Sequence, residues 1–151
     1  MPTSTWGPPT WVFLHTLVEK LKDETFQESK HIVFQFISRI CKNLPCPTCS
    51  AHAMLLLKRV HFPNVKSKED FKHVLFMMHN AVNRQKGKAL FEYSNLKMYS
   101  NKQLIPTYNA FISVFKTRGN MTLLPDSMQR QILISDLKQW IQKNLKYFNL
   151  K

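Results

Sequence analysis

Two cysteines separated by two residues are the clearest candidates for chemistry in this sequence, in the segment Cys46-Pro47-Thr48-Cys49. If a helix begins at this segment, its unpaired backbone N–H groups and its dipole stabilise a thiolate in the first turn. Cysteines in CxxC segments have depressed pKa values and are reactive. Two sulfurs in one helical turn also lie close enough to form a reducible disulfide. The spacing therefore favours thiol–disulfide redox chemistry at Cys46 and Cys49.

Two other kinds of site use a similar spacing. A thioredoxin-type site normally lies in a βαβ unit, which this sequence lacks. A zinc site would recruit Cys46, Cys49 and His52, with His61 or His79 as the fourth ligand. That CxxCxxH spacing is not a standard zinc motif, and no second CxxC follows it. Zinc binding is therefore the weaker hypothesis, and it stays open as a zinc-stabilised binding module.

A second set of polar residues, His79, Asn80 and Asn83, lies in a segment whose apolar neighbours predict a buried helix face. His79 and Asn83 are four residues apart and therefore share that face. Buried polar groups without partners cost about 1–3 kcal/mol each, so several of them together predict a bound polar ligand. Trp11 and His15 near the N-terminus belong to the same site if all these segments converge in one bundle.

The apolar residues recur at helical spacing almost throughout, and no segment alternates with period two long enough to predict a strand. We expect a first helix beginning at Pro8-Pro9, a second with an apolar stripe through Ile32, and a third beginning at the CxxC segment. A fourth begins at a capping box in residues 67–70 and ends at Gly87, and a short fifth covers residues 94–99. Short loops between them predict an all-α fold, a four-helix bundle plus a short fifth helix.

Residues 103–151 look like an addition to this bundle, with two more helices beginning near Pro106 and Pro125. The last helix has an apolar stripe that cannot stay exposed to water, so it must cover the bundle, a second subunit or a partner. The predicted organisation is a domain of residues 1–102 followed by a helical C-terminal extension of residues 103–151.

Composition limits the class of protein. Lys and Arg number 22 against 9 Asp and Glu, a net charge of +13 that is spread along the chain. Such a charge favours polyanions at low salt, although a lysine-rich solvated surface explains it more simply than dedicated nucleic-acid binding. An odd count of 3 Cys excludes a secreted disulfide framework. We find neither a signal peptide nor the ~20 apolar residues of a transmembrane span, and therefore expect a cytoplasmic protein.

Three segments, in chain order, resemble the signatures of the Erv/ALR family of FAD-linked sulfhydryl oxidases: WGPPTWVFLH (residues 6–15), LPCPTCSAH (44–52) and HNAVNRQKGK (79–88). The resemblance covers residues 6–99, and the combination is far more specific than any one segment. It implies a helical bundle that holds FAD between its helices, usually as a homodimer. It also implies an enzyme that oxidises protein thiols to disulfides and passes the electrons to O₂, giving H₂O₂.

The resemblance also implies roles for individual residues. Cys46 receives the attack of a substrate thiolate, and Cys49 faces the flavin and passes electrons to it. Trp11 and His15 contact the flavin, while Lys86 and Lys88 are candidates for the pyrophosphate. The full set of residues implied to bind FAD is Gly7, Pro8, Thr10, Trp11, His15, His52, His79, Asn80, Val82, Asn83, Lys86, Lys88 and Tyr99.

The cysteine count departs from the pattern of many members of that family. Only Cys41 remains outside the CxxC segment, so the chain cannot form a second, shuttle pair of its own. We therefore expect electrons to come from a thioredoxin-like carrier or directly from a client thiol protein. This layout resembles the short oxidases of large cytoplasmic DNA viruses, which implies work in a host cytoplasm. Cys41 itself is expected to be buried as a small hydrophobe, with a disulfide to a second subunit or partner as the alternative.

Overall fold

The computed structural model describes residues 3–116 and 124–151, with the side chains of the second range described from residue 128 onward. Its main elements are α1 (Thr3–Glu19), α2 (Phe26–Lys42), α3 (Pro47–Lys58), α4 (Lys68–Gln85), the 3₁₀ helix η3 (Tyr93–Asn101), α5 (Leu104–Phe115) and α6 (Leu124–Lys143). Within the described residues the only β pairing is an isolated bridge between Leu21 and Phe148. The predicted all-α fold, with four helices, a short fifth and a helical extension, is confirmed.

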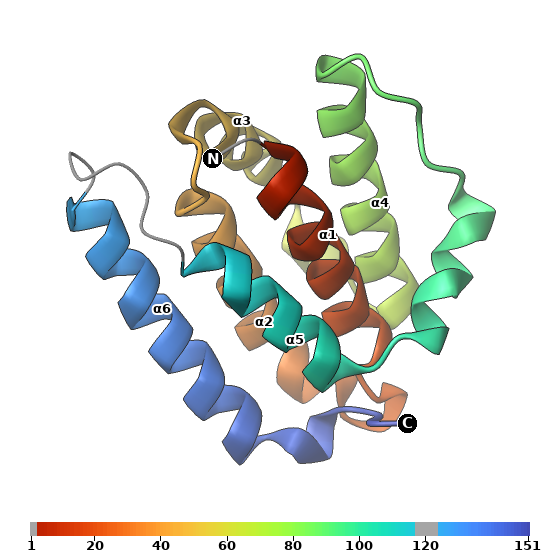
Figure 1. Ribbon diagram of the computed structural model, residues 1–151. Coiled ribbons are helices and arrows are strands. Elements are labelled where there is room, and N and C mark those ends of the chain that lie inside the picture. The colour runs from red at the N-terminus through yellow and green to blue at the C-terminus, as the bar shows by residue number, and fades with distance from the viewer. Residues whose placement is uncertain (1–2, 117–123) are drawn as a thin grey trace.

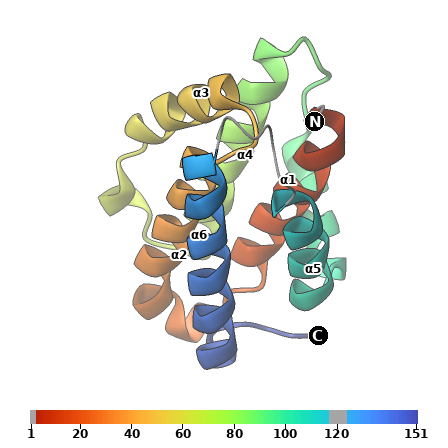
Figure 2. The same ribbon diagram turned by 60° about the vertical axis from the view of Figure 1, so that its left-hand side comes forward.

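Helix α1 is the central element of the molecule. It packs against α4 on one side and α5 on the other (Figure 1), and also contacts η3 and α2. Helix α6 lies along α2, as the turned view in Figure 2 shows, and α3 joins α2 to α4 at the upper end of the bundle. The extension therefore covers α1 and α2 of its own chain.

One hydrophobic core runs through all of these helices. Phe13 of α1 stacks on Phe111 of α5 with ring centroids 4.9 Å apart, and both side chains are fully buried. Phe71 of α4, Ile37 of α2 and Leu133 of α6 belong to the same cluster. Helices from both sides of the predicted boundary at residue 102 therefore share one core, whose burial supplies the main favourable term in folding.

The end of α1 is tied to two distant parts of the chain. Lys20 is only 4% exposed, and its ammonium donates hydrogen bonds to the carbonyl oxygens of Ser100 (2.8 Å) and Lys151 (2.9 Å). The bridge between Leu21 and Phe148 lies next to it. These contacts fix the last residues of the extension against the base of α1.

Local sequence signals place two helix ends as predicted. Ser67 is the N-cap of α4, and it forms a full capping box with Asp70. Helix α4 ends at Gln85, two residues before Gly87, which adopts a φ of +69° that glycine tolerates best. Both ends depend on contacts within a few residues, which is why the sequence predicts them well.

One expected helix start and one expected core residue are wrong. Helix α1 begins at Thr3, so Pro8 and Pro9 lie inside it instead of at its start. The burial of Trp6 holds the first turn in place, and the Thr10 hydroxyl donates to the Trp6 carbonyl (2.6 Å). On α2, Ile32 is 39% exposed, because the core face is turned toward Val33 and its helical neighbours.

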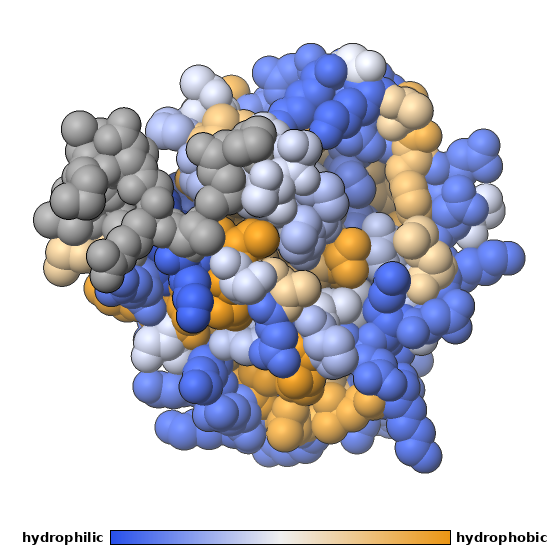
Figure 3. Space-filling model, in the orientation of Figure 1, coloured by the Kyte–Doolittle hydropathy of each residue, from blue (hydrophilic) through white to orange (hydrophobic). Residues whose placement is uncertain are grey.

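The surface of the molecule is largely hydrophilic. Hydrophilic side chains cover most of the face drawn in Figure 3, with apolar groups gathered in its lower part and in a strip at the upper right. No helix in the described ranges is both long enough and apolar enough to span a bilayer.

Candidate active site

A cavity of about 280 Å³ lies between the N-terminal half of α1, the start of α3 and the C-terminal half of α4. Most of its wall is apolar, with a few polar groups, which is the usual form of a cofactor or ligand site. The predicted site residues that line it are Gly7, Thr10, Trp11, Cys49, His52, Val82 and Lys86. The three sequence segments therefore do meet at one place in the fold.

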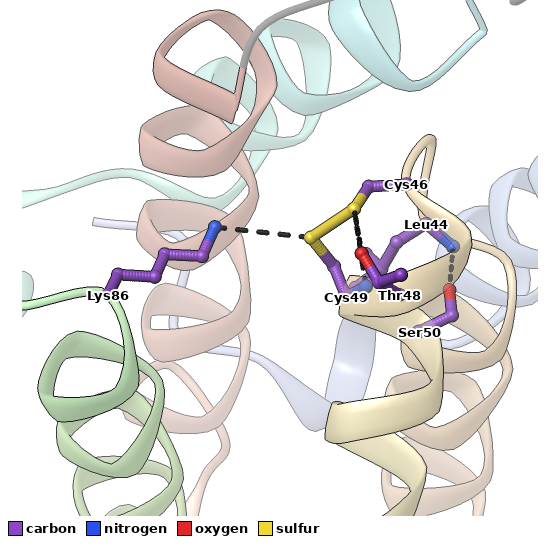
Figure 4. The surroundings of a disulfide bond; sticks show 6 residues. All are labelled: Leu44, Cys46, Thr48, Cys49, Ser50 and Lys86. Atoms are coloured by element: carbon purple, nitrogen blue, oxygen red, sulfur yellow. Dashed lines mark hydrogen bonds between the residues drawn. A yellow bond between two sulfur atoms is a disulfide. The ribbon is translucent and has the colours of Figure 1, made fainter.

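Cys46 and Cys49 form a disulfide at the start of α3, with Cα atoms 5.2 Å apart. Cys46 is the N-cap, as predicted, and its sulfur accepts a hydrogen bond of 3.2 Å from the backbone N–H of Cys49. The same sulfur lies 3.2 Å from the hydroxyl of Thr48 (Figure 4). A sulfur anion here would meet an N–H donor and the positive end of the helix dipole.

The two sulfurs have different surroundings. Both are partly exposed, but Cys49 lines the cavity whereas Cys46 lies outside the lining. The Nζ atom of Lys86 is 4.0 Å from the Cys49 sulfur (Figure 4). It is also 6.0 Å from the centroid of the Trp6 ring. Burial, together with the charge of Lys88, lowers the pKa of the Lys86 amine. The sulfur of Cys49 thus faces both the cavity and the ammonium of Lys86.

Four rings form a stack beside the cavity, which we call the ring stack. Its centre is a contact of 3.0 Å between Nε2 of His15 and Nδ1 of His79. Trp11 stacks on His79 with centroids 4.1 Å apart, and Tyr99 stacks on His15 with centroids 4.6 Å apart. Burial and the charge of His79 lower the pKa of His15 to about 3, and burial and the charge of Lys88 lower the pKa of His79 to about 4. Both imidazoles are therefore neutral at pH 7, and one donates its N–H to the other.

Four of the residues predicted to bind FAD lie neither in the cavity wall nor in the ring stack. The Asn80 amide donates to the Phe91 carbonyl (2.8 Å) and accepts from the Phe91 N–H (2.7 Å), so it fixes the segment that follows α4. Pro8 lines a separate groove between α1 and α5. Asn83 is half-buried and Lys88 is exposed. Of these four, Lys88 lies near enough to the ring stack for its charge to lower the pKa of His79, whereas Pro8 and Asn80 are engaged elsewhere.

Comparison with known proteins agrees with this arrangement. The model of the Erv1 / Alr family matches residues 8–102. The chain belongs to this family. It is 33% identical over 85 residues to FAD-linked sulfhydryl oxidase ERV1 of Arabidopsis thaliana, covering 56% of this chain and 44% of that protein. It is 27% identical over 71 residues to Probable FAD-linked sulfhydryl oxidase FPV093 of fowlpox virus, covering 47% and 67%.

The predicted resemblance to this family is therefore confirmed. The chain spans about half the length of the curated plant and yeast Erv1/Alr relatives that it matches. No solved structure matches the chain. The family match ends at residue 102, which is where we expect the extension to begin.

Trp6 is a cavity residue of this Erv1/Alr chain that the sequence did not assign, although it opens the first family segment. Its side chain is 4% exposed, and its buried indole N–H has no hydrogen-bond acceptor among the described residues. Buried N–H groups normally have a partner, and Trp6 lines the cavity. The carbonyl and nitrogen acceptors of an isoalloxazine ring would supply one. The residues present therefore fit the flavin that an FAD-linked family member requires.

Cys41, expected to be a buried hydrophobe, is indeed buried and has a free thiol. It lines the same cavity as Cys49. Burial raises the pKa of its thiol to about 12, so it stays protonated and unreactive near neutral pH. As for zinc, no three His, Cys, Asp or Glu side chains in the described part of the chain are placed to hold a metal ion together. The zinc hypothesis therefore has no ligand set there.

Proposed function

We propose that the chain is an FAD-dependent sulfhydryl oxidase, which oxidises protein thiols to disulfides and passes the electrons to O₂. The observation that carries this proposal is the Cys46–Cys49 disulfide, with Cys49 in the wall of a largely apolar cavity beside aromatic rings. Family membership supports the same activity, and so do the relatives that the chain matches, which are named FAD-linked sulfhydryl oxidases.

The two sulfurs divide the reaction between them. A substrate thiolate attacks Cys46, which lies outside the cavity; an S–S bond forms to the substrate and the Cys46–Cys49 bond breaks, leaving Cys49 as a thiolate. A second substrate thiolate then attacks the substrate sulfur, which releases the product disulfide and the thiolate of Cys46. FAD, when bound, supplies the two-electron acceptor that allows the Cys46–Cys49 bond to re-form, and O₂ receives the electrons as H₂O₂.

The residues that hold FAD are taken from the family resemblance and the cavity. Support is strongest for five residues that line the cavity with Cys49, namely Gly7, Thr10, Trp11, His52 and Val82. We add the Trp6 N–H as a donor to the flavin. The family resemblance adds Pro8, His15, His79, Asn80, Asn83, Lys86, Lys88 and Tyr99, of which Lys86 also lines the cavity.

We further propose partners and a place of action. The electron donor is a client thiol protein or a thioredoxin-like carrier, because the only cysteine besides the redox pair is buried. The similarity to a fowlpox virus protein supports work in the cytoplasm of a virus-infected cell. A homodimer would have to use surfaces other than those of α1 and α2 that α5 and α6 cover. Residues 103–151 then serve as an extension that stabilises the oxidase domain of residues 1–102.

Visible absorption of the purified full-length protein tests the proposal most directly. We expect bound flavin, and O₂ consumption that requires both a dithiol substrate and Cys49. The net charge of +13 also permits binding to a polyanion, which would weaken steeply with salt. A folded protein that is colourless after reconstitution with FAD, and that leaves dithiols reduced, would contradict the proposed activity.

A further inference from the structure

The side chain of Lys86 reaches from the end of α4 to the sulfur pair of α3. Its Nζ atom lies 4.0 Å from the sulfur of Cys49, and Figure 4 shows it pointing at this sulfur from across the cavity. Lys86 follows the last residue of α4 as its C-cap, and its backbone N–H donates to the Val82 carbonyl (3.1 Å). The helix end therefore fixes the backbone of Lys86, and its side chain is directed at one sulfur of the pair.

None of the described carboxylates forms an ion pair with this ammonium. The titratable side chains that line the cavity are Cys41, Cys49, His52 and Lys86, and none of the described lining residues is acidic. The ion pairs found among the described residues do not include Lys86. Its other close neighbour is the face of Trp6, which offers a weak cation–π contact. The site thus holds an exposed ammonium at the mouth of the cavity, with no ion-pair partner among the described residues.

An anion arises at that position when the disulfide is opened. We propose that Lys86 stabilises the thiolate that Cys49 becomes during thiol exchange, and so directs substrate attack to Cys46. This inference rests on the proposed oxidase function. The attack forms the bond between the substrate and Cys46, the Cys46–Cys49 bond breaks, and its electron pair stays on Cys49 beside the ammonium. No proton and no further reactant is needed for this step.

Direction follows from the difference between the two possible leaving groups. Exchange is faster when the departing sulfur is the more stable thiolate. The Cys46 sulfur is met by neutral donors, the Cys49 N–H and the Thr48 hydroxyl, whereas the Cys49 sulfur lies beside the full charge of Lys86. The substrate is therefore joined to Cys46, and the electrons collect on the sulfur that faces the cavity. Lys86 therefore acts on the sulfur chemistry, and the exposed Lys88 remains the candidate for the pyrophosphate of FAD.

The pKa of Cys49 in a Cys46→Ser variant tests this proposal. It is measured in the full-length flavoprotein as the pH dependence of modification by methyl methanethiosulfonate, with the site identified by mass spectrometry. Lys86→Met should raise the pKa of Cys49 by about one unit, in the range for loss of an opposite charge within ~4–6 Å. Lys86→Arg should restore the lower value. Lys58→Met, which removes an exposed charge at the far end of α3, should leave it unchanged.

The outcomes separate this inference from the proposed function. An unchanged pKa of Cys49 in Lys86→Met overturns it, as does an equal shift in Lys58→Met, which would mean that only net charge matters. Loss of flavin in Lys86→Met without a pKa shift also overturns it and assigns Lys86 to the cofactor. A pKa shift in a protein that never binds flavin would support the role of Lys86 while contradicting the proposed oxidase.

Discussion

The cavity has two chemically opposite neighbours, the disulfide at the start of α3 and the ring stack between α1 and η3. The disulfide is partly exposed and lies beside a helix N-terminus and the ammonium of Lys86. The ring stack is mostly buried, and its two imidazoles share one hydrogen bond and stay neutral. Helix α4 serves both, because it carries His79 in its interior and Lys86 at its end. One region is built to receive a charge, and the other to exclude charge.

This contrast has a simple physical origin. A new negative charge is stabilised only where donors or cations are already placed to meet it. Aromatic faces and neutral imidazoles offer shape and apolar contact instead, which suits a planar ring system. The structure therefore separates the disulfide and its neighbouring ammonium, which favour a negative charge, from the neutral and mostly buried rings of the stack.

Removal of the Cys49 sulfur should have the largest effect and tests whether the disulfide and the ring stack act independently. Cys49→Ser should abolish dithiol-dependent O₂ consumption, with a loss of at least about a thousandfold, as is typical when the nucleophile of a catalytic unit is removed. Flavin absorbance should remain, because the ring stack is untouched. Loss of both properties together would show that the two regions are not independent.

Acid should destabilise the ring stack before it affects the rest of the fold. Unfolded histidine has a pKa near 6.5, whereas the folded values are about 3 for His15 and about 4 for His79. Below pH 6.5 the unfolded chain therefore takes up protons that the folded chain does not, and stability is lost as the pH falls. From pH 7 to pH 5 we expect the free energy of unfolding to drop by about 2–3 kcal/mol, allowing for the partial exposure of His79.

Urea unfolding at the two pH values measures this loss. The window avoids Asp70, whose lowered pKa means that its contribution disappears only at still lower pH. The double variant His15→Gln with His79→Gln should flatten the dependence between pH 7 and pH 5. Equal stability of the unsubstituted protein at both values would show that the stacked imidazoles are not the source.

The smallest effect is expected at the third cysteine. Cys41 lines the cavity between the two regions, but its thiol is buried and protonated. Cys41→Ala should change turnover by less than about twofold, since a thiol without thiolate character exchanges slowly. Oxygen consumption with a dithiol measures this. A dead enzyme with its flavin in place would mean that Cys41 takes part in electron transfer.

Some of this site was predictable from the sequence, for local reasons. The start of α3 at Cys46 and the capping box at Ser67 depend on side chains within one turn, so their residue types are sufficient. The four-residue spacing along α4 likewise places His79 and Asn83 on one helical face. These features need no knowledge of what packs against the helix.

The rest depends on how distant segments meet. Pro8 lines a groove between α1 and α5, apart from the cavity that Cys49 lines. Asn80 is engaged by Phe91, which requires the chain to turn back after Gly87. The unpaired N–H of Trp6 is likewise a property of the assembled bundle. Periodicity gives the face of a helix only approximately, and these three positions required the packed structure.

The contacts of Lys20 affect how the molecule unfolds. Its ammonium is held by carbonyls at the end of η3 and at Lys151, so lifting residues 103–151 away would break the hydrogen bond to Lys151 and expose the stacked rings of Phe13 and Phe111 to water. The segment after residue 102 is thus joined to the bundle by the apolar faces of its helices and, at its C-terminal end, by the hydrogen bond between Lys20 and Lys151. On heating, we expect the chain to unfold in one cooperative step, with no populated intermediate in which residues 103–151 have detached from the bundle.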